Sequence, residues 1–110
     1  MGDLQPRNRI LWTSDSPLGF TVRVMDSQWQ KIIAVKHPVM AGREILVRTA
    51  IERPDQVRRS RSAHDVYLCY NLDRPGRWVC AVVKQTGREG FLITAYLTDA
   101  IKEGVLQWPK

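Results

Sequence analysis

The sequence predicts a single α+β domain, in which two N-terminal helices pack on a four-stranded antiparallel sheet. Three observations support this prediction. A chain of 110 residues has room for one hydrophobic core, so residues 1–110 are taken as one domain. Apolar residues recur at helical spacing in the first half of the chain. The second half instead contains short segments rich in Val, Tyr, Ile, Trp and Phe, which favour strands.

The first expected helix covers residues 27–37. The helical spacing i, i+3, i+4, i+7 is met there by Trp29, Ile32, Ile33 and Lys36. Pro38 should end this helix at or just before His37. A second helix is expected at 41–52, and its inner side would carry Ile45, Leu46, Thr49 and Ala50.

The expected sheet runs from about residue 57 to residue 108. Its strand candidates are 65–72, 77–85, 90–97 and 105–108. Glycine-containing turns separate the first three of them, at 73–76 and 86–90. Because these connections are short, neighbouring strands should pair antiparallel as a meander.

The N-terminal region adds a short strand or hairpin to this prediction. Residues 20–24 alternate apolar and polar side chains, and residues 10–12 are apolar. A Ser-Pro-Leu-Gly turn at 16–19 separates the two segments. Residues 1–8 are expected to be a loose tail, so the compact core should span 20–108.

The charge of the chain favours a polyanionic partner. The formal net charge is +6, and arginine supplies 12 of the 17 basic residues. Arginine binds phosphate through two parallel hydrogen bonds and stacks on bases, which lysine does not. The competing interpretation is that the charge only keeps a small protein in solution.

Composition also bears on the cellular setting. No apolar run approaches the roughly 20 residues that span a membrane, and the first residues lack the apolar core of a signal peptide. We therefore expect a cytoplasmic protein without membrane contact. Cys69 and Cys80 should be free thiols in a reducing compartment, either buried or neighbours on adjacent strands. The sequence has no phosphate-binding glycine loop, no dinucleotide fingerprint and no metal-ligand spacing, so we expect no cofactor and no metal.

Four separated polar residues are candidates for one catalytic site. His37 can exchange protons near neutral pH, or it can cap its own helix. Lys84 closes an apolar strand and could aim a cation at phosphate, or simply mark where the strand meets water. Thr94 and Tyr96 share a strand face, which period 2 would also give to Leu92, with Phe91, Ile93, Ala95 and Leu97 on the other face. A solvated strand face is the plain alternative for the two hydroxyls.

The densest basic cluster is a candidate site for nucleic-acid binding. It consists of Arg58, Arg59 and Arg61. On a strand, Arg59 and Arg61 would share one face, opposite Arg58. Protection of a sheet edge against unwanted pairing is the alternative role for such charges. His64, in a polar turn, is expected to be a solvated loop residue.

Several motifs together resemble the barnase–EndoU–colicin–RelE-like nuclease group, including phage members. They are Trp29 before an apolar helix, His37-Pro38, residues 54–60, residues 65–70, residues 82–84, residues 90–96 and residues 101–104. The resemblance covers roughly residues 20–108, and it rests on the order and spacing of short motifs. One departure is Val39, where an acidic residue follows His-Pro in many relatives.

The resemblance implies metal-independent RNA cleavage, in which the 2′-hydroxyl attacks the adjacent phosphorus. It assigns catalytic positions to His37, Lys84, Thr94 and Tyr96, and an RNA-binding arginine to the cluster at 58–61. It also implies a toxin-like or mobile-element setting, with an antitoxin or immunity protein as a partner besides RNA. Two other functions stay open from the residues alone. One is a non-catalytic nucleic-acid-binding module, and the other is a structural or partner-binding protein that uses exposed Trp12 and Trp108.

Overall fold

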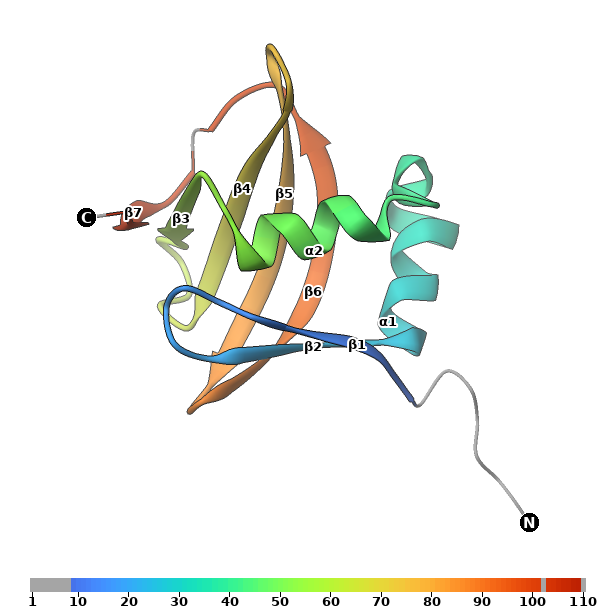
Figure 1. Ribbon diagram of the computed structural model, residues 1–110, viewed down its shortest axis with the longest axis horizontal. Helices are drawn as coiled ribbons and strands as arrows, with labels where there is room; N and C mark the ends of the chain where they lie inside the picture. The colour runs from blue at the N-terminus through green and yellow to red at the C-terminus, as the bar shows by residue number, and fades with distance from the viewer. Residues whose placement is uncertain (1–8, 102, 110) are drawn as a thin grey trace.

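In the computed structural model, which describes residues 9–101 and 103–109, seven strands form one mixed sheet. The expected tail at 1–8 lies outside the described residues. The strand order is β1-β2-β6-β5-β4-β3-β7 (Figure 1). The strands are β1 Ile10–Asp15, β2 Thr21–Met25, β3 Gln56–Arg59, β4 Val66–Arg74, β5 Arg77–Thr86, β6 Glu89–Thr98 and β7 Val105–Trp108.

The predicted fold class, two helices packed on a four-stranded antiparallel sheet, is therefore wrong. The N-terminal hairpin β1–β2 joins the main sheet, because β2 pairs with β6 in parallel over Thr21–Arg23 and Glu89–Phe91. Burial of Val22 and Val24 on the same core as the later strands holds this pairing. Parallel pairing joins segments far apart in the sequence, and the short local connections that favoured a meander do not reveal it.

The first predicted helix, 27–37, is observed as a continuous helical run over residues 26–36, whereas the second, predicted at 41–52, begins only at Glu44. The helical segments are α1 Asp26–Lys31, the π-helix η2 Ile32–Lys36, the 3₁₀-helix η3 Pro38–Met40 and α2 Glu44–Glu52. In η2 the His37 N–H donates to the Ile32 carbonyl at 2.7 Å, and Pro38, which lacks an N–H, then ends the turn. None of the helices in the described part of the chain is long and apolar enough to cross a membrane.

The inner side of α2 also differs from the prediction. Val47, Ala50 and Ile51 are buried, at the spacing i, i+3, i+4, whereas Ile45 is 77% exposed. The segment offers two overlapping apolar faces, and only the sheet decides which one is covered. Sequence periodicity alone did not distinguish them.

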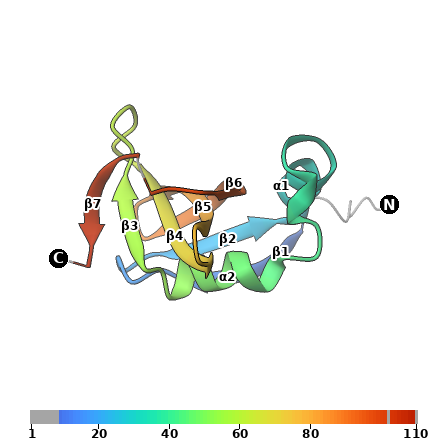
Figure 2. The same cartoon turned by 90° about the horizontal axis from the view of Figure 1, so that it is seen from above.

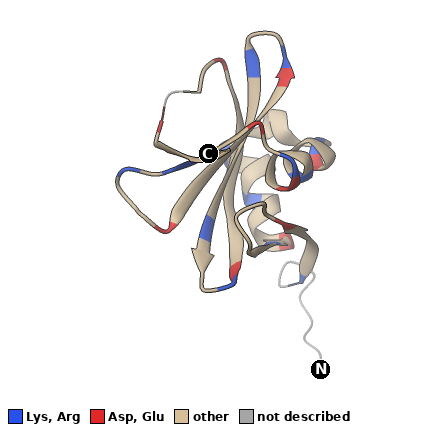
Figure 3. Ribbon diagram, turned by 60° about the vertical axis from the view of Figure 1, so that its left-hand side comes forward, with Lys and Arg blue, Asp and Glu red and all other residues tan. Residues whose placement is uncertain are grey.

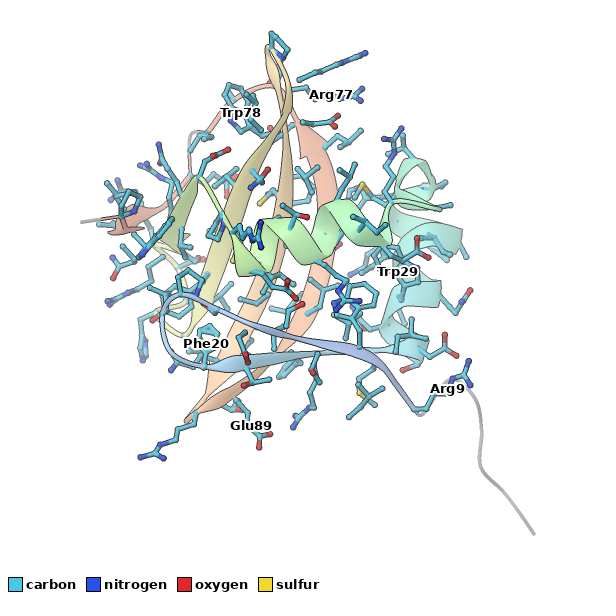
Figure 4. The ribbon with its side chains drawn as sticks, in the orientation of Figure 1. Arg9, Phe20, Trp29, Arg77, Trp78 and Glu89 are labelled. Carbon is cyan, nitrogen blue, oxygen red and sulfur yellow. The ribbon has the colours of Figure 1, made fainter. Side chains whose placement is uncertain are left out.

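The main core lies between α2 and one face of the sheet, which we call the inner face. Figure 2 shows α2 along one side of the curved sheet, with α1 beyond its end. The inner face carries Val57, Cys69, Val79, Ala81, Val83, Leu92 and Ala95. Trp29 of α1 lies where α1 approaches α2, and its ring meets the edge of Trp12 at 5.7 Å between centroids (Figure 4).

The three long strands and the two turns between them are confirmed. β4 pairs with β5, and β5 with β6, both antiparallel. One detail of β6 was predicted incorrectly. A bulge at Ile93 places Val82 opposite Thr94 but Val83 opposite Leu92, so Leu92 turns to the inner face and Phe91 shares the face of Thr94.

The last strand, β7, is held against β3 by a glycine and an arginine. Gly104 has a φ of +87°, and a Cβ added there would lie 2.5 Å from the Arg59 carbonyl oxygen. Arg58 donates from Nε to the Glu103 carbonyl at 2.8 Å and from Nη2 to the Gly104 carbonyl at 3.0 Å. The turn before β7 therefore accepts only a residue without a side chain.

We predict that Gly104→Ala lowers the free energy of unfolding by at least about 1 kcal/mol more than Gly76→Ala does. Both glycines have positive φ, which costs alanine about 1–2 kcal/mol. Gly76 has open space around it, so only Gly104→Ala adds a clash with backbone. Urea unfolding of the two variants measures the difference, and equal losses would contradict the packing of this turn.

Candidate functional site

The face of the sheet opposite α2, which we call the outer face, carries a row of two tyrosine side chains with a cysteine thiol between them. Tyr70 of β4 lies opposite Cys80 of β5, and Cys80 lies opposite Tyr96 of β6. Cross-strand partners point to the same face. A small second cluster, packed by Trp78 and Ile101, buries Tyr70 and Cys80 there.

Two further rows continue the outer face along the strands. Leu68, Val82 and Thr94 form the next row, and Val66, Lys84 and Phe91 form the one after it. Lys84, Thr94 and Tyr96 thus share one face, which the pairing register decides. Lys84 lies four residues along β5 from Cys80, the cross-strand partner of Tyr96. At the usual rise of a strand, the rows of Lys84 and Tyr96 are therefore ~13 Å apart.

His37 joins this face from outside the sheet. Its imidazole lies against Tyr96, with 5.5 Å between ring centroids and 43° between the ring planes. The Gln28 side-chain amide holds α1 beside β6 by donating to the Ile93 carbonyl, beyond the point where β2 stops pairing with β6. The chain that follows α1 then places His37 next to Tyr96. Within residues 9–101 and 103–109, the imidazole makes no hydrogen bond to a helix carbonyl, so the capping role is not seen.

Lys84 lies apart from the histidine–tyrosine pair. Its ammonium group is 3.8 Å from the Asp65 carboxylate, and both side chains are about two-fifths exposed. An ion pair this exposed contributes little and exchanges easily for another anion. The structure therefore brings together His37, Thr94 and Tyr96, and it places Lys84 on the same face at a distance.

Burial sets the protonation of the polar row. Burial raises the pKa of the Tyr96 hydroxyl well above its usual value, and the neighbouring Cys80 thiol raises it further. The pKa of Tyr70 rises for the same two reasons. Burial raises the pKa of the Cys80 thiol to about 12, although hydrogen bonds from the two tyrosines lower it in part. Both phenols and the thiol are therefore protonated near neutral pH, so Tyr96 is a hydrogen-bond donor there.

Thr94 contributes an unusual hydroxyl. Its Oγ1 is fully buried, and no partner for it is found in the described part of the chain. Leaving a buried hydroxyl unpaired costs about 1–3 kcal/mol. Because the oxygen is enclosed by protein, a ligand on this face could accept its hydrogen bond only after a neighbouring side chain moved.

Of the three arginines in the cluster at 58–61, two make hydrogen bonds within the protein. Arg58 donates to the carbonyls before β7, and Arg59 donates from Nη2 to the Gln107 side chain at 3.0 Å. Arg61 is exposed and lines a surface hollow of about 340 Å³ with Ser60, Ser62, Glu103 and Gly104. The basic residues as a whole spread over turns, strands and helices (Figure 3).

The structure confirms one of the remaining predictions about surface residues and contradicts another. His64 is exposed in the loop between β3 and β4, as predicted. Trp12 and Trp108 are not the exposed contacts that the partner-binding hypothesis required, because both are half-buried against the main core. Cys69 and Cys80 are buried free thiols on adjacent strands, and they point to opposite faces.

Sequence reasoning missed Tyr70, Cys80 and Phe91 as members of the outer face. Counting outward from the glycine turn at 73–76 would have paired Cys80 with Asn71, because an irregularity between Leu72 and Arg74 shifts the register of β4 and β5 by one residue. Phe91 was missed for the same kind of reason, because the Ile93 bulge reverses its orientation.

Comparison of the chain with protein-family models, with curated proteins and with solved structures found no match. Among the described residues, no group of three or more His, Cys, Asp or Glu side chains is arranged to hold a metal ion.

We predict that Thr94→Val stabilises the protein by about 1 kcal/mol, because valine has nearly the same shape and removes a buried, unpaired hydroxyl. The matched control is Thr49→Val, which deletes the hydrogen bond from the Thr49 hydroxyl to the Ile45 carbonyl and should not stabilise. Chemical unfolding of both variants gives the comparison. A loss of stability in Thr94→Val would show that the hydroxyl has a partner in the free protein.

Proposed function

We propose that the protein is an endoribonuclease that cleaves RNA by attack of the 2′-hydroxyl on the adjacent phosphorus, at the outer face of the sheet. The observation that carries this proposal is the contact between the His37 and Tyr96 rings, 5.5 Å between centroids, beside the unpaired Thr94 hydroxyl. A proton-exchanging imidazole, a protonated phenol and a free hydroxyl donor are the groups that such a reaction uses.

In the proposed reaction, the side chains of His37 and Tyr96 exchange protons with the substrate and then with each other. His37 takes the proton of the 2′-hydroxyl as its oxygen forms a bond to phosphorus. The bond from phosphorus to the 5′-oxygen then breaks, and that oxygen takes the phenolic proton of Tyr96. The imidazolium of His37 returns a proton to the tyrosinate beside it. The products are a 2′,3′-cyclic phosphate and a 5′-hydroxyl, and both side chains end as they began.

The phenol suits the second step for a physical reason. Because burial raises its pKa, the Tyr96 phenol keeps its proton in the free protein and would release it only to a strong base such as the departing alkoxide. A general acid works best with a pKa near the working pH, so the reaction requires bound substrate to lower the pKa of Tyr96. If substrate binding exposes the Thr94 hydroxyl, which is buried in the free protein, that hydroxyl would donate to a nonbridging phosphate oxygen and so stabilise the charge that develops on the phosphorane. Lys84 has no proton-transfer role in either step, because its row lies ~13 Å along the strands from the row of Tyr96.

The setting of this activity also remains a proposal. Two free thiols fit a reducing compartment such as the cytoplasm. A toxin-like or mobile-element role, with an antitoxin or immunity protein as partner, stays a prediction that rests on the motif resemblance alone. The fold differs from the one that this resemblance implied, so the proposal depends on the site.

We predict that His37→Ala lowers the cleavage rate by about 10²–10⁴-fold and leaves RNA affinity nearly unchanged, because a proton carrier acts in the transition state. The matched control is His64→Ala, which removes the exposed loop histidine and should cleave normally. Tyr96→Phe keeps the ring contact and should lose a similar factor. Labelled RNA incubated in chelator, with analysis for cyclic-phosphate ends, gives the rates.

Two outcomes would contradict the proposal. Wild-type protein that binds RNA in a salt-sensitive manner without cleaving it would favour the non-catalytic nucleic-acid-binding module instead. Equal cleavage by His37→Ala and the wild type would remove the histidine from the reaction.

We predict that Arg61→Ala weakens RNA binding a few-fold and reduces the salt dependence by about one phosphate contact. Arg58→Ala should instead lower stability, since Arg58 bonds two carbonyls that precede β7. Filter binding at several salt concentrations and thermal unfolding separate the two effects. A loss of affinity in a stably folded Arg58→Ala, with none in Arg61→Ala, would reverse the assignment.

A further inference from the structure

A surface hollow lies beside β6, on the side from which α1 approaches. It measures about 540 Å³, within the range of about 300–1,000 Å³ that is usual for small-molecule sites. Its walls are mostly apolar, with two polar side chains from the start of α1. The residues around it are Ile10, Arg23, Met25, Ser27, Gln28, Phe91 and Leu92.

Phe91 connects this hollow to the outer face. The Ile93 bulge turns Phe91 to the face of Thr94, and Phe91 is the direct cross-strand partner of Lys84. Phe91 is only partly buried. A flat apolar ring beside a cation is the arrangement that holds a base by stacking and its phosphate by charge.

The ion pairs near Phe91 leave the Lys84 ammonium group available to bind a ligand. Arg23, at the rim, is paired with Glu89, whereas the ion pair of Lys84 with Asp65 is long and exposed. A phosphate can therefore displace Asp65 at little cost. Ser27 and the Gln28 side-chain oxygen can meet the polar edge of a base inside the hollow.

We propose that Phe91, Lys84 and this hollow form a second nucleotide subsite, so that the preferred substrate is single-stranded RNA of several nucleotides. This inference rests on the proposed function, which places the scissile phosphate at His37 and Tyr96. The rows of Tyr96 and Phe91 are ~13 Å apart. A stacked strand advances ~3.4 Å per nucleotide and an extended one advances further, so about two to four nucleotides join the two places. A base-paired duplex cannot offer a base to the ring.

The test compares short and long substrates in variants of the subsite. Phe91→Leu keeps an apolar side chain and loses the flat ring. It should weaken binding of a six-nucleotide single-stranded 2′-deoxy oligomer by about 5–100-fold, the usual value of one stacked base. Cleavage of a two-nucleotide RNA, too short to reach the subsite, should stay within about twofold of the wild type.

Charge variants give an independent readout if Phe91→Leu folds poorly. Lys84→Ala should weaken binding of the six-nucleotide oligomer, and Asp65→Asn, which frees the lysine, should tighten it. The matched control is Arg53→Ala, an exposed cation at the end of α2 that should have a much smaller effect than Lys84→Ala.

The outcomes separate this subsite from the proposed reaction. Normal cleavage of both substrates with unchanged oligomer binding in Phe91→Leu, Lys84→Ala and Asp65→Asn would overturn the subsite and leave the reaction standing. If the wild type cleaves nothing, weaker oligomer binding in Phe91→Leu and Lys84→Ala together with tighter binding in Asp65→Asn would support the subsite and overturn the reaction. Equal binding of duplex and single strand would also overturn the subsite.

Discussion

The bulge at Ile93 is the feature on which the arrangement of the candidate site depends. β2 pairs with β6 only over Glu89–Phe91, and beyond that point the edge of β6 needs another partner. The bulged Ile93 carbonyl accepts a hydrogen bond from Gln28, which fixes α1 beside the strand. The π-helix and Pro38 that follow α1 then bring His37 to the outer face, against Tyr96. The same bulge turns Phe91 to this face and Leu92 into the core. One extra residue in a strand therefore sets both the contact between the His37 and Tyr96 rings and the neighbouring hollow.

The outer face also differs from the inner face in the polar groups that it buries. The inner face is filled by apolar side chains under α2, whereas the outer face buries two tyrosines, a thiol and an unpaired threonine hydroxyl. Burying such groups costs free energy unless each finds a partner. Cys80 partly satisfies its two tyrosine neighbours, and Thr94 stays unsatisfied. A face built only for stability would favour valine or leucine at these positions, so the polar row is the strongest physical reason to look for a ligand there.

The sequence predicted local structure better than long-range structure. The strands β4, β5 and β6 follow from strand-forming residues and two glycine turns, and Pro38 ends the first helical segment as expected. The parallel pairing of β2 with β6 was missed, because no local pattern encodes which distant strand is a neighbour. The face of Leu92 and Phe91 was predicted incorrectly, since strict alternation cannot reveal an inserted residue. Within the candidate site, the shared face of Thr94 and Tyr96 followed from period 2. The structural roles of Arg58 and Arg59 depended on β7 lying beside β3, which the sequence did not indicate.

The most direct test of the outer face as the RNA site is an NMR titration of the two histidine side chains and the backbone amides with a non-cleavable 2′-deoxy oligomer. The account predicts that the imidazole signals of His37 move while those of His64 stay in place. It also predicts that the amide shifts gather on β6 around Phe91, Thr94 and Tyr96, and that α2 is unaffected. Shifts confined to α2 or to the loop around His64, with His37 unmoved, would contradict it.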